Sequence, residues 1–499
     1  MNQQSPIERI VNSKFYPLLL FFVSFVFVTL FSRSTSFLYI TEGSDPSLFK
    51  SMGMAILKGH TLYIDYFDNK GYILYFIYAL GVWLGGNLPL LLMQSLSLTI
   101  TLIIWDKMLA LYRDEHFRFI GLAVALLLLL CFYTEGGLTQ EWCLPLASYP
   151  LLIYFRSLKT NQEIHSLQMF TIGLCFGIIT FIQINNATPF LGFLAYIWIR
   201  QLLEKRINNF ISSLMCFILG LLPIVIISVL YFYLKAGWHG VYEMVYASFL
   251  SNFEYLSAIS HSHIHYVVFY FLFLISFLLF AIISCQDKKV LIPLLLSTAM
   301  FIVSYGKLCH IYYLMAFVPL CIVGFMTFDF SEKKKLKIVL VGLSSISLIF
   351  YIIKPLHLLV NDLILGNEKE VAIYRDFHNF VESIPEEEHD SIYNYNLNSY
   401  GTSMMQHEGL LQCNRVLFST LAFKLPKLHE EEVNKSFSAP LWIMISWKKT
   451  YKKNDAYFIL NNYELKYSFI YDRIYLTKPK IGKAFEICLY RRKDPVPAP

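Results

Sequence analysis

The chain has 499 residues, of which 56% are hydrophobic and only 15% are charged, and its mean hydropathy is +0.51. Soluble domains carry roughly 25% charged residues, so this composition excludes an ordinary soluble protein and predicts a polytopic membrane protein. The net charge of +6 says little about partners, because the basic residues are unevenly placed. We expect a lipid bilayer around the chain and no nucleic-acid partner.

The first apolar run, residues 17–31, is expected to be a retained helix. It has no small-residue cleavage site and further apolar runs follow it, so we do not interpret it as a signal peptide. Seven of the nine cysteines lie in or beside apolar runs, where they are typical small core residues. Only Cys413 and Cys488 lie in the polar tail, and the spacing leaves open whether they pair.

Apolar runs of helical length recur along the first 355 residues. They lie at roughly residues 15–33, 88–111, 118–133, 145–158, 168–184, 187–203, 210–234, 266–284, 290–305, 312–330 and 338–355. A bilayer core needs about 17–25 helical residues. One more apolar run, 71–84, has only 14 residues, which suits an interfacial or re-entrant helix. We therefore predict eleven transmembrane helices.

The distribution of basic residues supports leaving 71–84 outside the membrane core. With that assumption, sixteen basic residues lie on one side and seven on the other. The larger set is Arg9, Lys14, Lys107, Arg113, Arg118, Arg156, Lys159, Arg200, Lys205, Arg206, Lys288, Lys289, Lys333, Lys334, Lys335 and Lys337, and the smaller is Arg33, Lys50, Lys58, Lys70, Lys235, Lys307 and Lys354. Because basic loops face the cytoplasm, the N-terminus is predicted inside and Asp45 outside.

The tail after about residue 355 is predicted to form a separate extracytoplasmic domain. Its pattern alternates between a helix at 368–383 and strands at 391–396, 441–446 and 485–491. Alternating helix and strand signals favour an α/β domain. The predicted fold class is thus a polytopic all-α membrane domain, residues 1–355 with a large first outer loop at 34–87, followed by an α/β domain at 356–499.

Asp45 follows the first predicted span and precedes Pro46, so a helix is expected to start near Ser47. Two roles fit this position. Aspartate is a good N-terminal helix cap, and an exposed carboxylate beside a membrane also serves as a general base for an acceptor hydroxyl.

The segment YIDYFDNKG, residues 63–71, is the densest group of ionisable residues in the first loop. Asp65, Asp68 and Lys70 fit a hydrated turn with weak local ion pairs. They also fit a site in which the lysine is presented to a lipid phosphate just above the bilayer.

Other predicted outer loops carry further candidate residues. The loop at 134–144 brings Glu135 and Glu141 close to the membrane, where they fit a turn, a sugar or acceptor site, or a divalent cation. Lys307 and His310 lie at another outer helix end and suit a phosphate, although lysine also snorkels at such positions. The histidines of HSHIH, 261–265, fit interfacial residues better than a metal site.

The later spans are poor in ionisable groups. From 168–184 onward, the only charged residues within the spans are Arg200, Asp329 and Lys354, all at span ends. Ion-coupled carriers usually place such groups near the midplane. The pattern therefore favours chemistry at the outer surface over transport.

These outer motifs resemble those of the GT-C glycosyltransferases that use polyprenyl-phosphate sugars, a group that includes protein O-mannosyltransferases and lipid A aminoarabinose transferases. The similar stretches are Asp45, GHTLYIDYFDNKG at 59–71, GGLTQEW at 136–142, QINNA at 183–187 and GKLCHIYY at 306–313. The chain departs from the group in four places. Gly71 and Tyr72 stand in place of a proline pair, Gln140 in place of a glutamate, and Gln183 and Lys307 in place of arginines.

The resemblance implies a bacterial inner-membrane enzyme that transfers a sugar from a polyprenyl-phosphate donor to an envelope glycan, lipid or protein hydroxyl. It implies Asp45 as the general base in a single displacement. Lys70, Lys307 and His310 would offset the phosphate charge. Asp65, Asp68 and Glu141 would shape the site and orient sugar or acceptor. Some members of the group need a divalent metal and others do not, and these residues leave both alternatives open; they indicate no other cofactor.

Two other functions remain open at this stage. One is a flippase or carrier of lipid-linked sugars. The other is a binding subunit that has the fold but no activity, which the replacements at Gln140 and Gln183 keep open. The Arg415 side chain and the turn at 394–398 are further predicted acceptor contacts.

Overall fold

The computed structural model describes residues 10–11, 13–35, 43–133, 135–252, 254, 264–307, 309–329, 334–360, 368–397, 399–413, 415–416, 440–447, 453–471 and 485–493. The chain divides into two compact units. Unit 1 comprises Met1–Ser32, Leu91–Tyr231 and Ser260–Leu356. Unit 2 comprises Arg33–Leu90, Phe232–Ile259 and His357–Pro499.

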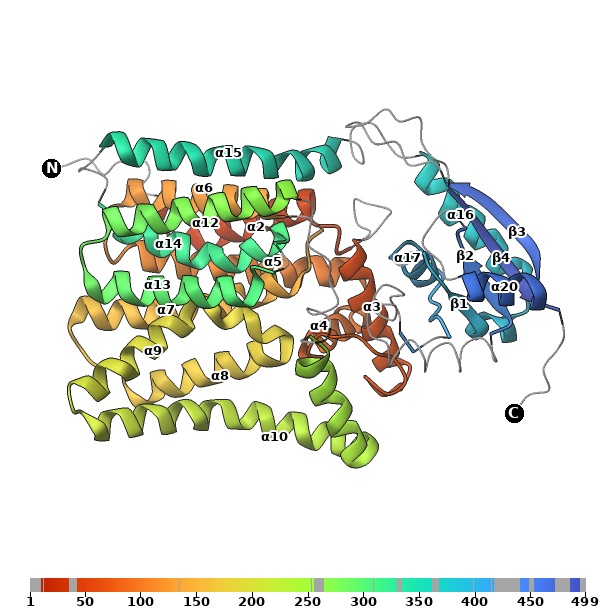
Figure 1. Ribbon diagram of the computed structural model, residues 1–499, viewed down its shortest axis with the longest axis horizontal. Coiled ribbons are helices and arrows are strands. Elements are labelled where there is room, and N and C mark those ends of the chain that lie inside the picture. The colour runs from red at the N-terminus through yellow and green to blue at the C-terminus, as the bar shows by residue number, and fades with distance from the viewer. Residues whose placement is uncertain are drawn as a thin grey trace. The chain divides into compact units, whose positions relative to one another are not determined.

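Unit 1 is a bundle of helices that lie roughly side by side (Figure 1). Its helices are α2 (Tyr16–Phe31), α5 (Asn87–Leu109), α6 (Glu115–Phe132), α7 (Thr139–Thr160), α8 (Ser166–Gln183), η1 (Ile184–Ala187), α9 (Thr188–Leu203), most of α10 (Ile207–Val245), α12 (Ile264–Ser284), α13 (Lys288–Tyr305), η3 (Ile311–Phe317), α14 (Val318–Thr327) and α15 (Lys334–Leu359). A helix occupies each of the eleven predicted spans. Within the described residues, seven segments are long and apolar enough to cross a bilayer by length and composition.

The long helix α10 changes direction at Ala236 and Gly237. Gly237 has φ of +61°, which ends the regular helix after the predicted span at 210–234. The turns that follow belong to unit 2. The apolar run therefore predicted the position of the span correctly, and Gly237 ends the regular helix just after it.

In unit 2 the first loop forms two helices that pack on each other, α3 (Ser44–Leu57) and α4 (Tyr72–Trp83). The sequence predicted that this first helix would start near Ser47. The helix instead begins at Ser44, because Gly43 occupies the cap position and its carbonyl accepts from the Ser47 amide. Helix α4 has 12 residues, or roughly 18 Å at 1.5 Å per residue. That length is short of the roughly 30 Å bilayer core, in agreement with a helix that does not cross.

The tail carries a four-stranded sheet in the order β1-β2-β4-β3. The strands are β1 (Ile392–Asn394), β2 (Trp442–Ile445), β3 (Tyr463–Tyr471) and β4 (Phe485–Arg492); β1 and β2 are parallel, and the other pairs are antiparallel. Three of these strands and the helix α16 (Glu368–Ser383) were predicted. Strand β3 and the helices α17 (Ser399–His407) and α20 (Lys453–Asn462) were not predicted from the sequence.

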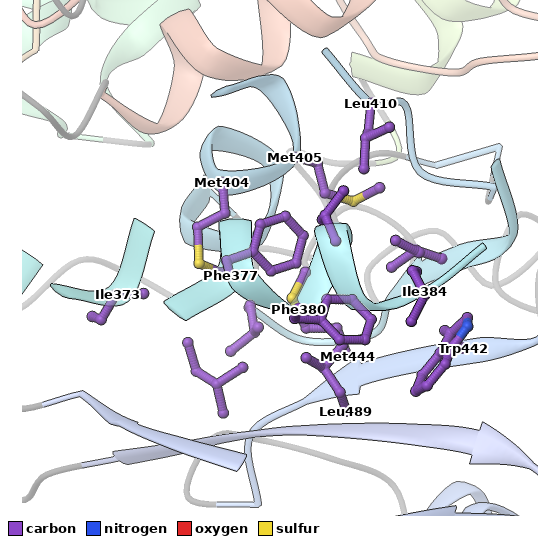
Figure 2. Close-up of a cluster of buried hydrophobic side chains, with 14 residues drawn as sticks. Ile373, Phe377, Phe380, Ile384, Met404, Met405, Leu410, Trp442, Met444 and Leu489 are labelled. Carbon is purple, nitrogen blue, oxygen red and sulfur yellow. The ribbon is translucent and has the colours of Figure 1, made fainter. Parts of the chain in front are cut away.

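Side chains alternate along each strand, so each strand presents residues to both faces of the sheet. Helices pack on both faces. On one face, Trp442 and Met444 of β2 pack with Phe377 and Phe380 of α16 and with Met404 of α17 (Figure 2). On the other face, residues of β2 and β4 pack with α20; they include Ile443, Ile445, Cys488 and Ile459.

Neither Cys413 nor Cys488 is part of a disulfide. Cys413 is exposed and Cys488 is buried in the sheet core. The pairing that the sequence left open is therefore not formed in this structure.

Candidate active site

Residues 59–71 of unit 2 form a tight turn after α3. Tyr63 has φ of +66°, a left-handed backbone conformation that is unusual for a bulky residue. The side chain of Tyr63 is fully buried, its hydroxyl donates to the carbonyl of Lys70 at 2.7 Å, and its ring stacks on Phe232 with 5.4 Å between centroids. Such a conformation persists only where the surroundings enforce it, so this turn is a rigid frame.

Asp68 and Lys70 are oriented by this frame. The buried carboxylate of Asp68 accepts a 2.6 Å hydrogen bond from the hydroxyl of Tyr75. Burial and then the Asp68 charge raise the pKa of Tyr75 well above its usual value, so the phenol keeps its proton and donates. The half-buried Lys70 ammonium donates to Asn69 Oδ1 at 2.6 Å.

Asp45 and Asp65 are more accessible than Asp68. Asp45 is half-buried in the first turn of α3, where a carboxylate is stabilised by the positive end of the helix. Asp65 is exposed, and its Oδ2 accepts from the Thr61 amide at 2.6 Å and lies 3.8 Å from His60 Nδ1. Asp65 thus closes the turn locally, whereas Asp45 is positioned by the first turn of α3.

Arg415 ties the tail to this turn within unit 2. One guanidinium nitrogen donates to the Tyr63 carbonyl at 2.5 Å and to the Glu243 carboxylate at 2.8 Å. The Arg415 carbonyl accepts from the Phe67 amide at 2.7 Å, and its guanidinium lies 5.5 Å from the Phe67 ring centre. Sequence reasoning predicted Arg415 as a substrate contact. The contacts described here are with protein and hold the turn, and no sequence signal links Arg415 to Glu243.

Removing the Arg415 side chain as Arg415→Met should lower the free energy of unfolding by about 1.5–3 kcal/mol, because Glu243 loses a charged hydrogen-bond partner. Arg415→Met combined with Glu243→Gln should cost less than the sum of the single changes. Thermal unfolding of the purified protein measures this. Lys466→Gln, which removes an exposed ion pair with Glu464, serves as the control and should change stability by no more than about 1 kcal/mol. Additive effects of the two changes would show that the pair is not coupled.

The structure describes residues 394–397 of the predicted 394–398 turn, and Asn394 and Asn396 are buried. Asn396 exchanges two hydrogen bonds of 2.8–2.9 Å with the backbone of Ser446, and Asn394 accepts from the Leu397 amide at 3.2 Å. Both side chains therefore hold the tail fold, and their predicted acceptor contact stays a prediction.

Glu141 lies at the centre of a buried hydrogen-bond network in unit 1. It accepts hydrogen bonds from the Tyr133 hydroxyl, from Gln94 Nε2 at 3.0 Å, and from the Leu138 amide at 3.2 Å. Ser32 donates in turn to Gln94 Oε1 at 3.1 Å. Sequence reasoning found Glu141 but missed Gln94 and Tyr133. A lone glutamine inside an apolar run was the available signal for Gln94.

Two glycines make this network possible. Gly136 and Gly137 have φ of +71° and +66°, a backbone region that favours glycine. A Cβ on Gly136 would overlap Ser32 Oγ and would lie only 2.8 Å from Ser32 Cα. The loop before α7 therefore approaches α2 more closely than any side chain permits.

Glu141 precedes the predicted span at 145–158, and its burial raises the pKa of its carboxyl to about 7, although the Tyr133 and Gln94 hydrogen bonds act in the opposite direction. The folded protein thus holds this proton more tightly than the unfolded chain. The stability that it contributes is full below pH 4.5, the ordinary pKa, and is lost as the pH rises through about 7.

Glu141→Gln should therefore remove part of the pH dependence of stability. The unfolding midpoint of the unchanged protein should fall relative to that of the variant as the pH rises from about 5 to 7, because the variant carries no charge at this site. Thermal scans across pH 5–8 measure the difference. Glu135→Gln, which alters a half-exposed carboxylate in the same loop, is the control. Parallel curves for the protein and Glu141→Gln would contradict the expectation.

Three motifs that are far apart in the sequence meet in unit 1. Thr139 of α7 donates to Gln183, and Asn186 accepts a 2.7 Å hydrogen bond from the Tyr305 hydroxyl. The Tyr305 ring stacks on Tyr313 with 4.5 Å between centroids. The stretches 136–142, 183–187 and 306–313 thus form one cluster.

Lys307 and His310 lie at the edge of this cluster and are exposed. The His310 ring stacks in parallel on Tyr312, with centroids 5.6 Å apart. Unit 1 therefore carries Glu141, Lys307 and His310, and unit 2 carries Asp45, Asp65, Asp68 and Lys70.

A metal site is not evident in the part of the chain that the structure describes. Among those residues, no three His, Cys, Asp or Glu side chains are grouped as a metal site requires. His261 and His263 of the HSHIH stretch lie outside the described residues.

The sequence matches no family model and no curated protein. Its structure is similar to a solved structure of ArnT from Cupriavidus metallidurans, with a TM-score of 0.57, covering 96% of this chain and 98% of that chain. ArnT is a GT-C glycosyltransferase, a lipid A aminoarabinose transferase. This chain has the GT-C fold. Because the two sequences are only 11% identical, the likeness establishes the fold and not the reaction.

The GT-C fold confirms the predicted fold class, a polytopic membrane protein with a C-terminal α/β domain. The boundary predicted between residues 355 and 356 stays a prediction. The cytoplasmic location predicted for the N-terminus also stays a prediction.

Proposed function

We propose that the chain is an integral membrane glycosyltransferase that transfers a sugar from a polyprenyl-phosphate donor to an extracytoplasmic hydroxyl. The observation that carries this proposal is the GT-C fold over nearly the whole chain, shared with a protein solved with undecaprenyl phosphate bound. The rigid turn that holds Asp68 and Lys70 supports it independently, since enzymes keep strained backbone at functional sites.

The proposed reaction is a single displacement with Asp45 as the general base. The Asp45 carboxylate takes the proton of the acceptor hydroxyl, whose oxygen attacks the anomeric carbon of the donor sugar. The new C–O bond forms as the bond to the lipid phosphate breaks. The lipid phosphate leaves with the electron pair, and the anomeric configuration inverts.

The leaving phosphate needs positive charge nearby. Lys70 is proposed for this role in unit 2, and Lys307 and His310 in unit 1. Lys70 is held by the turn through its carbonyl and its ammonium, whereas Lys307 is exposed at a helix end. Lysine binds phosphate as a point charge, so these positions do not require the planar geometry of arginine.

Asp65, Asp68 and Glu141 are proposed to shape the site and orient sugar or acceptor. Asp68 and Glu141 are each held by a tyrosine hydroxyl, and this fixes their carboxylates before substrate arrives. The acceptor is proposed to be an envelope glycan, lipid or protein hydroxyl.

Purified protein incubated with polyprenyl-phosphate sugars tests the assignment. An enzyme should hydrolyse the donor slowly when water replaces the acceptor and release the polyprenyl phosphate, which chromatography detects. A carrier or an inactive binding subunit should leave the donor intact. If the Asp45→Asn variant releases polyprenyl phosphate at the unchanged rate, Asp45 is not the general base, although the protein is still an enzyme.

A further inference from the structure

Unit 1 contains a polar cavity of about 220 Å³ at the ends of helices α7, α8 and α9. It is bounded by the loop at 161–164, by Arg206 before α10, and by Lys289 at the start of α13. The cavity is far larger than the roughly 10–15 Å³ that one water requires. All these segments belong to the side predicted to face the cytoplasm.

The charged side chains of the cavity offer more donors than acceptors. Three cations, Arg200, Arg206 and Lys289, line it with one carboxylate, Glu163. Both oxygens of Glu163 are already engaged, one by Arg206 and the other by Asn209 Nδ2 at 2.8 Å. The carboxylate therefore has little remaining capacity to compensate another cation.

The two arginines are oriented by a second carboxylate. Arg200 Nε lies 2.6 Å from Glu204 Oε1, and Arg206 pairs with Glu204 Oε2. Arg206 Nε is buried and has no hydrogen-bond partner in the structure. Within the described residues, the Lys289 ammonium has no hydrogen-bond or ion-pair partner. A buried donor such as Arg206 Nε is normally satisfied, whereas Lys289 is only half-buried.

We propose that this cavity binds a phosphate group. A phosphate oxygen accepts several charge-assisted hydrogen bonds at once, and both Arg206 Nε and Lys289 Nζ are available to donate them. Anionic lipids place phosphates at the inner membrane surface, and a free phosphate ion offers the same chemistry. This site is independent of the proposed sugar transfer.

The test uses the full-length protein purified in uncharged detergent. It is titrated with phosphatidylglycerol micelles, with phosphatidylcholine micelles, or with inorganic phosphate, and binding is followed by native mass spectrometry and by the unfolding midpoint. Lys289→Gln should weaken binding about fivefold, the effect of one basic residue near an anionic headgroup. Lys288→Gln is the matched control, because Lys288 is exposed beside Lys289 and does not line the cavity.

Binding that depends on Lys289, with phosphatidylglycerol and not with inorganic phosphate, identifies a lipid headgroup. Lys289-dependent binding of inorganic phosphate identifies the free ion. Arg206→Gln should give a larger loss, but it also breaks two ion pairs, so Lys289→Gln decides. Equal effects of Lys288→Gln and Lys289→Gln, or equal binding of both lipids in all variants, would overturn the proposal.

Discussion

Asp45→Asn is expected to reduce sugar transfer by about 10²–10⁴-fold, the usual contribution of a general base, while donor binding stays nearly unchanged. Asparagine has the size and polarity of aspartate but cannot accept the acceptor proton. The donor lacks that proton, so its binding should not sense the change. The measurement compares single-turnover transfer with binding of a donor analogue in the same preparation.

The control must separate catalysis from the loss of one charge. Glu382→Gln removes an exposed carboxylate from α16 and should leave transfer unchanged. Asp45→Asn also removes a carboxylate from the first turn of α3, which costs about 0.3–1 kcal/mol of stability. The variant should therefore remain folded. Transfer at a near-normal rate in a folded Asp45→Asn protein would exclude the residue as the base.

The fold was largely predictable because hydrophobicity determines it. Apolar runs located a helix at each predicted span, and the amphipathic pattern of 368–383 gave both bounds of α16. Strand β3, Tyr463–Tyr471, was missed because charged residues such as Glu464 and Lys466 alternate in it and pair with each other on an exposed surface. Its partner β4 has an uninterrupted apolar centre at residues 487–490 and was predicted.

The candidate site was predictable in its residues but not in their partners. Glu141 and Asp68 stand out in sequence as carboxylates in outer loops. The groups that hold them, Tyr133, Gln94 and Tyr75, are ordinary residues of apolar segments. Arg415 donates to a carbonyl 352 positions away. Such contacts depend on how distant segments pack together, and they cannot be predicted from a single sequence.

Gly136→Ala is expected to have the largest effect on stability. The left-handed backbone costs an alanine about 1–2 kcal/mol, and its Cβ would also overlap Ser32, whose backbone Cα would lie 2.8 Å away. The overlap cannot be relieved by a rotamer change. The loop would have to move away from α2. This movement would separate Glu141 from Gln94, which is itself held by the Ser32 hydroxyl. Both the unfolding midpoint and transfer should fall.

Gly59→Ala separates the two causes. Gly59 has φ of +89°, but no atom lies within 4 Å of its added Cβ, so alanine there brings the dihedral cost alone. The unfolding midpoint should fall modestly in Gly59→Ala and much further in Gly136→Ala. Adding Ser32→Gly to Gly136→Ala removes the Oγ and Cβ atoms nearest to the new methyl group and should restore part of the loss, but not all of it, because the overlap with the backbone of residue 32 remains. Equal losses in the two single variants would mean that the close approach of the loop to α2 does not stabilise this site.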